Sequence, residues 1–157
     1  MIRDATVDDV TAIAALIRAL AGYEHLEHEV TLDETHLREH LFGERRYAEV
    51  LIAEDAAQTV GFALYFHNFS TFLGRPGIDL EDLFVLPEHR GRGHGKALLA
   101  RLARIAIERG CGRLEWSVLD WNEPSIAFYR SLGARAMDDW TTYRLDGSAL
   151  AALATER

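Results

Sequence analysis

The segment Ile78–Leu99, IDLEDLFVLPEHRGRGHGKALL, combines three carboxylates with a glycine-rich basic loop. Its first half is apolar enough for a buried strand, yet it carries Asp79, Glu81 and Asp82. Removing a carboxylate from water costs several kcal/mol unless it gains a partner, so we expect these acids to have a role. Side chains alternate across a strand, which places Asp79 and Glu81 on one face and Asp82 on the other. All three can serve one site only if a β-bulge intervenes.

The loop Arg90–Lys96, RGRGHGK, joins this strand to a predicted helix. Unpaired backbone N–H groups and the positive end of the helix dipole meet at such a junction, which favours phosphate binding. The loop is not a Walker motif, because Arg90 and Ala97 stand where that motif has Gly and Ser or Thr. It is not GxGxxG either, since the third glycine comes one residue early, at Gly95. The remaining pattern, RxxGxG, fits a phosphate site or a purely structural turn.

Charge is distributed unevenly along the chain. Residues 88–113 hold seven basic side chains and two acids, although the whole chain has a net charge of −8. This pattern favours an anionic ligand at one place and a cationic ligand elsewhere, and it disfavours nucleic acid, whose backbone needs an extended basic surface. No apolar run is long enough to span a membrane, and residues 1–20 do not resemble a secretory signal, so we expect a cytoplasmic protein. Cys111, the only cysteine, lies between two glycines and is interpreted as a packing residue.

Hydrophobic periodicity predicts a mixed α/β chain that forms one domain over residues 1–157. Thr6 and Asp9 have the spacing of a helix-start pair, Thr31 is the expected cap of the second helix, and Asn122 with Pro124 is expected to begin a later one. The predicted strands cover residues 2–5, 48–54, 60–70, 78–86, 113–119, 135–137 and 141–145. The predicted helices cover approximately residues 7–22, 32–42, 94–110, 122–133 and 148–154.

Three motifs at these separations, LED (80–82), RGRGHG (90–95) and WNEPSIAFY (121–129), resemble the GNAT superfamily of acetyl-CoA-dependent N-acetyltransferases. Within it the chain is most similar to the diamine (spermidine/spermine) N-acetyltransferase family, from its opening residues 2–6 to the region of Trp140. The resemblance implies a mostly antiparallel sheet of about seven strands, splayed at the acetyl-CoA site and flanked by helices. It also implies a bulge in the strand that carries the acids, and a homodimer.

The resemblance further assigns residues to acetyl-CoA, the expected co-substrate. Loop amides hold the coenzyme pyrophosphate, and the strand backbone lies beside the pantetheine and the acetyl carbonyl. His94 and Lys96 are departures, since many relatives have an apolar residue and a small hydroxyl residue there. The implied coenzyme-binding residues are Leu83, Phe84, Val85, Arg90, Gly91, Arg92, Gly93, His94, Gly95, Lys96, Asn122, Ser125 and Tyr129.

Amine acetylation explains the need for an acid. An alkylamine with a pKa of about 10.4 is almost entirely protonated at neutral pH, so the site must attract an ammonium and remove its proton. Glu81 is the predicted base, acting directly or through one water, with its pKa raised by burial. A backbone N–H near Phe84 is predicted to stabilise the oxyanion, and Tyr129 to protonate the departing thiolate. The structural alternatives are arginine ion pairs for Asp79 and Asp82, and a tyrosine hydroxyl bound to a backbone carbonyl.

The acceptor residues implied by the resemblance are Tyr23 and Glu24, which we group with Glu81 and Asp82; a solvated acidic face is the alternative. His36 and His40 have no third partner, so we expect no metal. The predicted function is direct transfer of acetyl from acetyl-CoA to a primary amine of a polyamine, diamine or lysine-like small molecule. The alternatives are an acetyltransferase for an aminoglycoside or a protein N-terminus, and a non-catalytic acyl-CoA-binding sensor.

Overall fold

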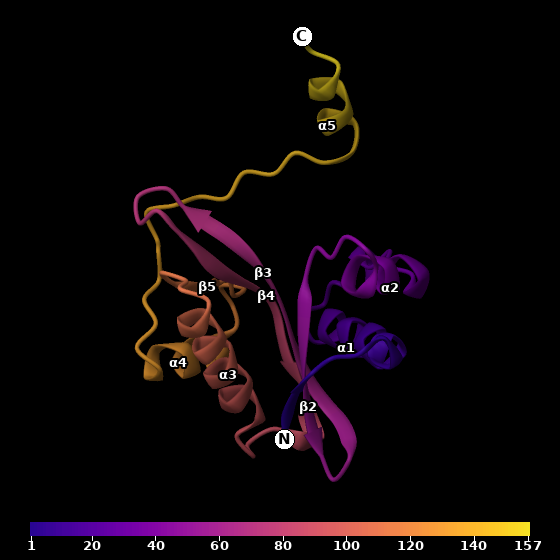
Figure 1. The fold of residues 1–157 in the computed structure, drawn as a ribbon, viewed down its shortest axis with the longest axis vertical. Helices are drawn as coiled ribbons and strands as arrows, with labels where there is room; N and C mark the ends of the chain where they lie inside the picture. The colour runs from indigo at the N-terminus through magenta and orange to yellow at the C-terminus, as the bar shows by residue number, and fades with distance from the viewer. The chain divides into compact units, whose positions relative to one another are not determined.

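The computed structural model describes residues 1–157, which form two compact units, Met1–Ser117 and Val118–Arg157. The first unit contains one five-stranded sheet of order β1-β2-β3-β4-β5, antiparallel except for the parallel pair β4 and β5. Helices α1 and α2 lie on one face of this sheet and α3 on the other (Figure 1). The strands are β1 Ile2–Asp4, β2 Glu49–Asp55, β3 Gln58–Ser70, β4 Arg75–Val85 and β5 Leu114–Trp116. The helices are α1 Val10–Tyr23, α2 Glu34–Phe42 and α3 His94–Glu108, with short 3-10 turns at Val7–Asp9, Glu27–Glu29 and Pro87–His89.

Apolar spacing explains why both helical layers form. In α1, Ile13 and Leu16 are buried against Phe62 of β3 and Phe84 of β4, in one hydrophobic cluster. In α3, the buried residues recur at intervals of three and four, as a helix lying on a sheet requires. β2 and the first half of β3 therefore have buried apolar side chains on both faces, whereas β4 interrupts its apolar residues with three acids.

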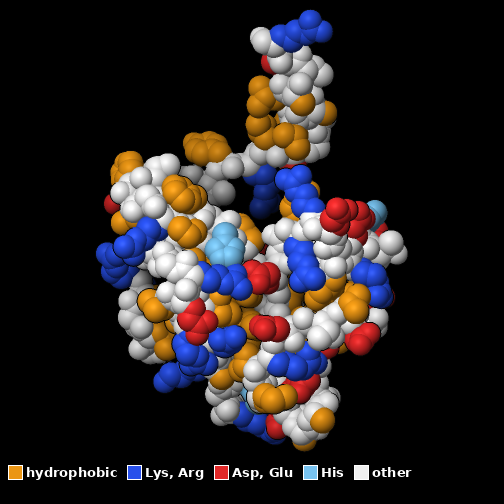
Figure 2. Space-filling view, viewed as in Figure 1, with side chains coloured by type: hydrophobic (Ala, Val, Ile, Leu, Met, Phe, Trp, Pro, Cys, Tyr) orange, Lys and Arg blue, Asp and Glu red, His pale blue; other side chains and the backbone are white.

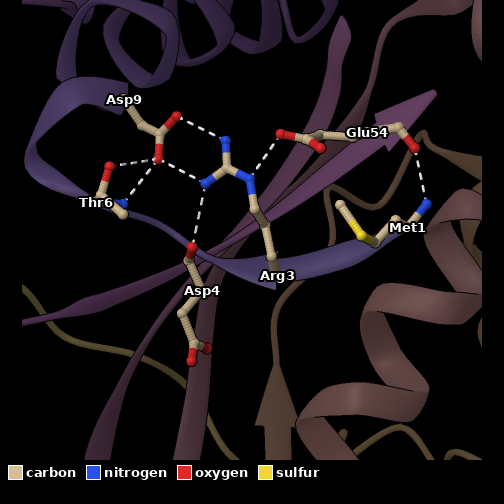
Figure 3. Close-up of polar contacts among 6 residues, drawn as sticks. All are labelled: Met1, Arg3, Asp4, Thr6, Asp9 and Glu54. Carbon is tan, nitrogen blue, oxygen red and sulfur yellow. Dashed lines mark hydrogen bonds and ion pairs between the residues drawn. The ribbon is translucent and has the colours of Figure 1, made fainter. Parts of the chain in front are cut away.

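Arg3 fastens the first strand to two neighbouring elements (Figure 3). Its guanidinium donates to Asp9 at 2.8 and 2.9 Å and to Glu54 at 2.6 Å. The Thr6 backbone N–H donates to the same Asp9 carboxylate at 2.7 Å, which confirms the predicted helix-start pair. The Arg3 hydrogen bond is the main reason that the pKa of Asp9 lies below its usual range. The bidentate pair with Asp9 thus joins β1 to the entry of α1, and the hydrogen bond to Glu54 joins β1 to the end of β2.

A β-bulge interrupts the pairing of β3 with β4. Leu64 pairs with Asp82 and Tyr65 pairs with Leu80, so Glu81 is the extra residue on β4. Two consecutive residues of the bulged strand then face one residue of its partner, and their side chains emerge on the same face of the sheet. The bulge implied by the resemblance is confirmed.

The second unit contains two helices, α4 Glu123–Ser131 and α5 Gly147–Ala154. The Asn122 side chain accepts a hydrogen bond from the Ser125 backbone N–H at 3.4 Å, and Pro124 lies in the first turn, as predicted. The strands predicted at 135–137 and 141–145 are absent, so the sheet has five strands instead of about seven. A strand needs a paired edge to satisfy its backbone, and alternating apolar residues alone do not supply one.

Of two further predictions, one is confirmed and one is wrong. The predicted hairpin of 48–54 and 60–70 is confirmed as β2 and β3. Thr31 is not the cap of α2: Asp33 holds that place, because its carboxylate accepts from the His36 backbone N–H at 2.9 Å. No helix combines the length and the apolar character needed to cross a membrane. A single domain over residues 1–157 stays a prediction.

Candidate active site

Strand β4 has an open edge just before the glycine loop. β5 pairs only with Ile78–Leu80, although β4 continues to Val85. The Leu86 N–H donates to Val60 of β3 at 2.8 Å, so by alternation Leu83 and Val85 direct their backbone groups away from β3. Backbone donors are therefore available along the edge next to the loop. This edge includes the positions at which the coenzyme and the oxyanion were predicted to bind.

The loop itself presents a run of unsatisfied backbone amides. Gly91 and Gly93 have φ of 76° and 86°, in the left-handed region that favours glycine. Ala97 is the first residue of α3 whose backbone N–H has an acceptor in the protein, and it donates to the Gly93 carbonyl at 2.9 Å. The six amides of residues 91–96 have no acceptor in the protein. Consecutive free amides at the positive end of a 15-residue helix form a cradle suited to a phosphate group.

Arg90 connects this loop with the opposite face of β4. Its Nε donates to the Val85 carbonyl at 2.9 Å. Its guanidinium carbon lies 4.7 Å from the centre of the Tyr23 ring and 5.3 Å from that of Phe84. These two rings are 6.3 Å apart. The side chain of Arg90 therefore reaches toward the residues predicted to bind the acceptor, and sequence reasoning did not foresee this contact.

The bulge places Glu81 and Asp82 on one face of the sheet, beside Glu24 at the end of α1. Burial is the main reason that the pKa of Asp82 is raised to about 6, and the charges of Glu81 and Glu24 raise it further. Burial also raises the pKa of Glu24. We predicted Glu81 to be buried, but it is exposed, because the bulge turns it out of the paired ladder. The structure thus brings the three predicted acceptor-site carboxylates together.

Asp79 belongs to a different cluster. Burial and the charge of Glu115 raise its pKa, while a hydrogen bond from Asn68 acts in the opposite direction. Neither Asp79 nor Asp82 forms an ion pair, so the structural alternative of an arginine partner is ruled out for both. Each instead lies near other acids, which raise its pKa further. Two carboxylates in the middle of β4 therefore keep raised pKa values.

The remaining predicted site residues lie in the second unit. Asn122 is buried at the start of α4, Ser125 follows in its first turn, and Tyr129 is partly buried on the same helix. Seven residues separate Asn122 from Tyr129, close to two helical turns. The roles proposed for these residues stay predictions.

The face drawn in Figure 2 does not separate a basic from an acidic region. Acidic and basic side chains are interspersed over it, although the sequence predicted an uneven distribution of charge. No group of three or more His, Cys, Asp or Glu side chains is placed to hold a metal ion. Cys111 is buried and free, as expected for a packing residue.

Comparison with known proteins identifies the fold and then the family. The structure matches an integron cassette protein from the mobile metagenome of V. cholerae with a TM-score of 0.80, at 29% identity over 99% of this chain and 98% of that chain. The model of the Acetyltransferase (GNAT) family matches residues 12–134, and this chain belongs to that family.

Two curated relatives extend the match. The thialysine N-epsilon-acetyltransferase of Bos taurus is 38% identical over 98% of this chain and 96% of its own length. The spermidine/spermine N(1)-acetyltransferase-like protein 1 of Homo sapiens is 33% identical over 99% of this chain, which spans 24% of that longer protein. The resemblance drawn from the sequence motifs is confirmed.

Proposed function

We propose that this protein transfers an acetyl group from acetyl-CoA directly to a primary amine of a small cationic acceptor, such as a polyamine, a diamine or a lysine-like amino acid. The observation that carries the proposal is the division of β4 by its bulge. After the bulge, β4 leaves backbone donors open at its edge, next to the amide-rich loop. At the bulge, it presents Asp82 near further acids. A thioester and an ammonium ion need these two environments side by side.

The loop residues fit the coenzyme pyrophosphate. The free amides of residues 91–96 are hydrogen-bond donors for phosphate oxygens, and Lys96 is exposed with no ion pair of its own. Leu83 and Val85 direct backbone groups to the open edge, where they suit the amide groups of pantetheine and the acetyl carbonyl. A backbone N–H there, next to Phe84, would stabilise the oxyanion formed when the amine attacks the thioester.

The adjacent pair Glu81 and Asp82 takes the proton of the ammonium. Asp82 is the stronger base, because its pKa of about 6 lies closer to neutral pH than that of an ordinary carboxylate. Glu81, which is exposed, meets the incoming cation and accepts its proton directly or through one water. Glu24 adds a third negative charge, and Tyr23 offers an aromatic face for the alkyl part of the acceptor.

The leaving thiolate needs a proton, and Tyr129 supplies it. The amine attacks the acetyl carbon, the carbon–sulfur bond breaks, and the phenol proton passes to sulfur. Cys111 is buried and lacks an activating partner, which favours a direct transfer over an acetyl-enzyme intermediate. The family resemblance further supports a homodimer, which light scattering at assay concentration checks.

Steady-state thiol release from acetyl-CoA tests the activity and the acceptor class together. We expect the highest kcat/KM with thialysine, lysine-like amines or polyamines, and values lower by tenfold or more with neutral amino compounds. Glu24→Gln removes one attracting charge and should raise KM for the cationic amine, whereas Glu39→Gln, an exposed acid on α2, should leave it unchanged. Equal rates on neutral and cationic amines would refute charge steering. Coenzyme binding with no turnover on any amine would favour a sensor.

A further inference from the structure

The tip of the β2–β3 hairpin holds the coenzyme loop through one carboxylate. Oδ2 of Asp55, the last residue of β2, lies 2.8 Å from Nη1 of Arg92. The same oxygen lies 3.5 Å from Nδ1 of His89 and 3.8 Å from Nε2 of His94. One oxygen atom therefore faces three side chains that carry positive charge or acquire it on protonation. No sequence pattern indicated this cluster.

The two imidazoles lie at opposite ends of the loop and are shielded from solvent. His89 ends the 3-10 turn before the loop, and His94 is the first residue of α3 after it. Their side chains are only 15% and 13% exposed. The ring nitrogens that face Asp55 are buried and form no hydrogen bond. A buried polar nitrogen without a partner is unfavourable, so this arrangement needs an explanation.

The hairpin turn keeps the carboxylate in place. Ala56 and Ala57, which follow Asp55, have φ of 48° and 64°, a region that alanine seldom adopts. The Asp55 side chain is 34% exposed, and a hydrogen bond from Arg92, followed by the contacts of His89 and His94, lowers the pKa of this carboxyl. The contact spans 37 residues of sequence.

We propose that Asp55 is a positioning residue for coenzyme binding, which holds the loop in its phosphate-binding conformation through His89, Arg92 and His94. The inference rests on the proposed function, because it assumes that residues 91–96 bind the pyrophosphate. Asp55 itself does not touch the coenzyme. Its charge alone would repel a phosphate, so a positioning role and a purely electrostatic role have opposite consequences when the charge is removed.

Calorimetric titration of coenzyme A into the full chain tests the inference. Asp55→Asn should weaken binding about fivefold, the upper range for an exposed ion pair, and Asp55→Glu should recover most of the loss. Asp8→Asn removes an exposed carboxylate that has no ion pair and should change nothing. In an Arg92→Gln background, the effect of Asp55→Asn should shrink, because part of it acts through Arg92.

A second variant keeps the test independent of the hairpin's stability. His89→Gln with His94→Gln leaves Asp55 and its turn intact and removes two of the three side chains that face its carboxylate. Coenzyme binding by this variant should weaken, and Asp55→Asn made in its background should have a smaller effect than in the wild type. Unchanged or tighter binding by Asp55→Asn, or an effect that is equally large in both backgrounds, would overturn the positioning role alone. A wild-type chain that binds no coenzyme would overturn the proposed function and this inference with it.

Discussion

Asp82 is predicted to be costly for stability and necessary for activity, and replacing it with asparagine separates the two effects. Its pKa rises from 3.8 to about 6 on folding, chiefly through burial. Between these values the folded chain binds more protons than the unfolded chain, so the free energy of unfolding falls as pH rises through this window. Below pH 3.8 the cost is absent, and above pH 6 it is fully present.

The size of the effect follows from the shift. Roughly two pKa units correspond to about 3 kcal/mol against the ionised form. Asparagine removes the charge and keeps the shape, but its buried amide needs partners of its own. We therefore expect Asp82→Asn to raise the free energy of unfolding by about 1–3 kcal/mol at pH 7 and to change it little at pH 4.

Urea unfolding at pH 4 and pH 7, with amine acetylation at pH 7, provides the assay. Asp82→Asn should be more stable than the wild type at pH 7 and should lose most of its kcat/KM. Asp79→Asn is the matched control, because burial also raises the pKa of Asp79 but its neighbours are Glu115 and Asn68. That variant should gain stability and retain activity. If Asp82→Asn is less stable at pH 7, or shifts stability equally at both pH values, the electrostatic account of β4 is wrong.

Two other predictions concern Asp9 and Tyr129. Asp9→Asn should lower the free energy of unfolding by about 2 kcal/mol at pH 7, because Arg3 holds the pKa of Asp9 below its usual range. The loss should shrink as the pH falls through that lowered pKa. Urea unfolding measures it, and an equal loss at pH 2.5 would contradict the prediction. Tyr129→Phe should lower turnover while coenzyme binding stays nearly constant; unchanged single-turnover rates would remove Tyr129 as the proton donor.

Local patterns predicted much of the local structure in both units. Helix-start and cap residues such as Asp9 and Asn122 act over three residues, and the glycines of the loop act on their own backbone. Such short-range effects are visible in the sequence. Thr31 failed as a cap because Asp33 is a competing cap two residues later, and spacing alone does not choose between them.

The acids of β4 show where prediction from alternation reaches its limit. A strict period of two separates Glu81 from Asp82, and only a bulge unites them. The resemblance supplied that bulge, but not its consequence, which is that Glu81 is exposed while Asp82 is partly buried. Which of the two acids is exposed depends on which residue of β4 leaves the paired ladder. The register of β4 with β3 decides that, and the sequence of β4 alone does not show it.

Two contacts between distant segments were not predicted. Asp55 meets Arg92 and Arg90 meets Tyr23 because the sheet and α1 bring them together, and no periodicity records such meetings. The two C-terminal strands failed for a related reason. Residues that can form a strand at 135–137 and 141–145 do not suffice, because a strand also requires an edge in register.

The bulge explains how one strand serves both halves of the proposed reaction. A regular strand would alternate its side chains and leave Asp82 opposite Glu81, so that only one acid could face an ammonium. The extra residue gives both acids to the face beside Glu24, and the strand then resumes its alternation through Phe84, with the backbone of Leu83 and Val85 at the open edge. The charge proposed to attract an amine and the donors proposed for a thioester carbonyl therefore come from neighbouring residues of one strand, which places the two halves of the proposed reaction side by side.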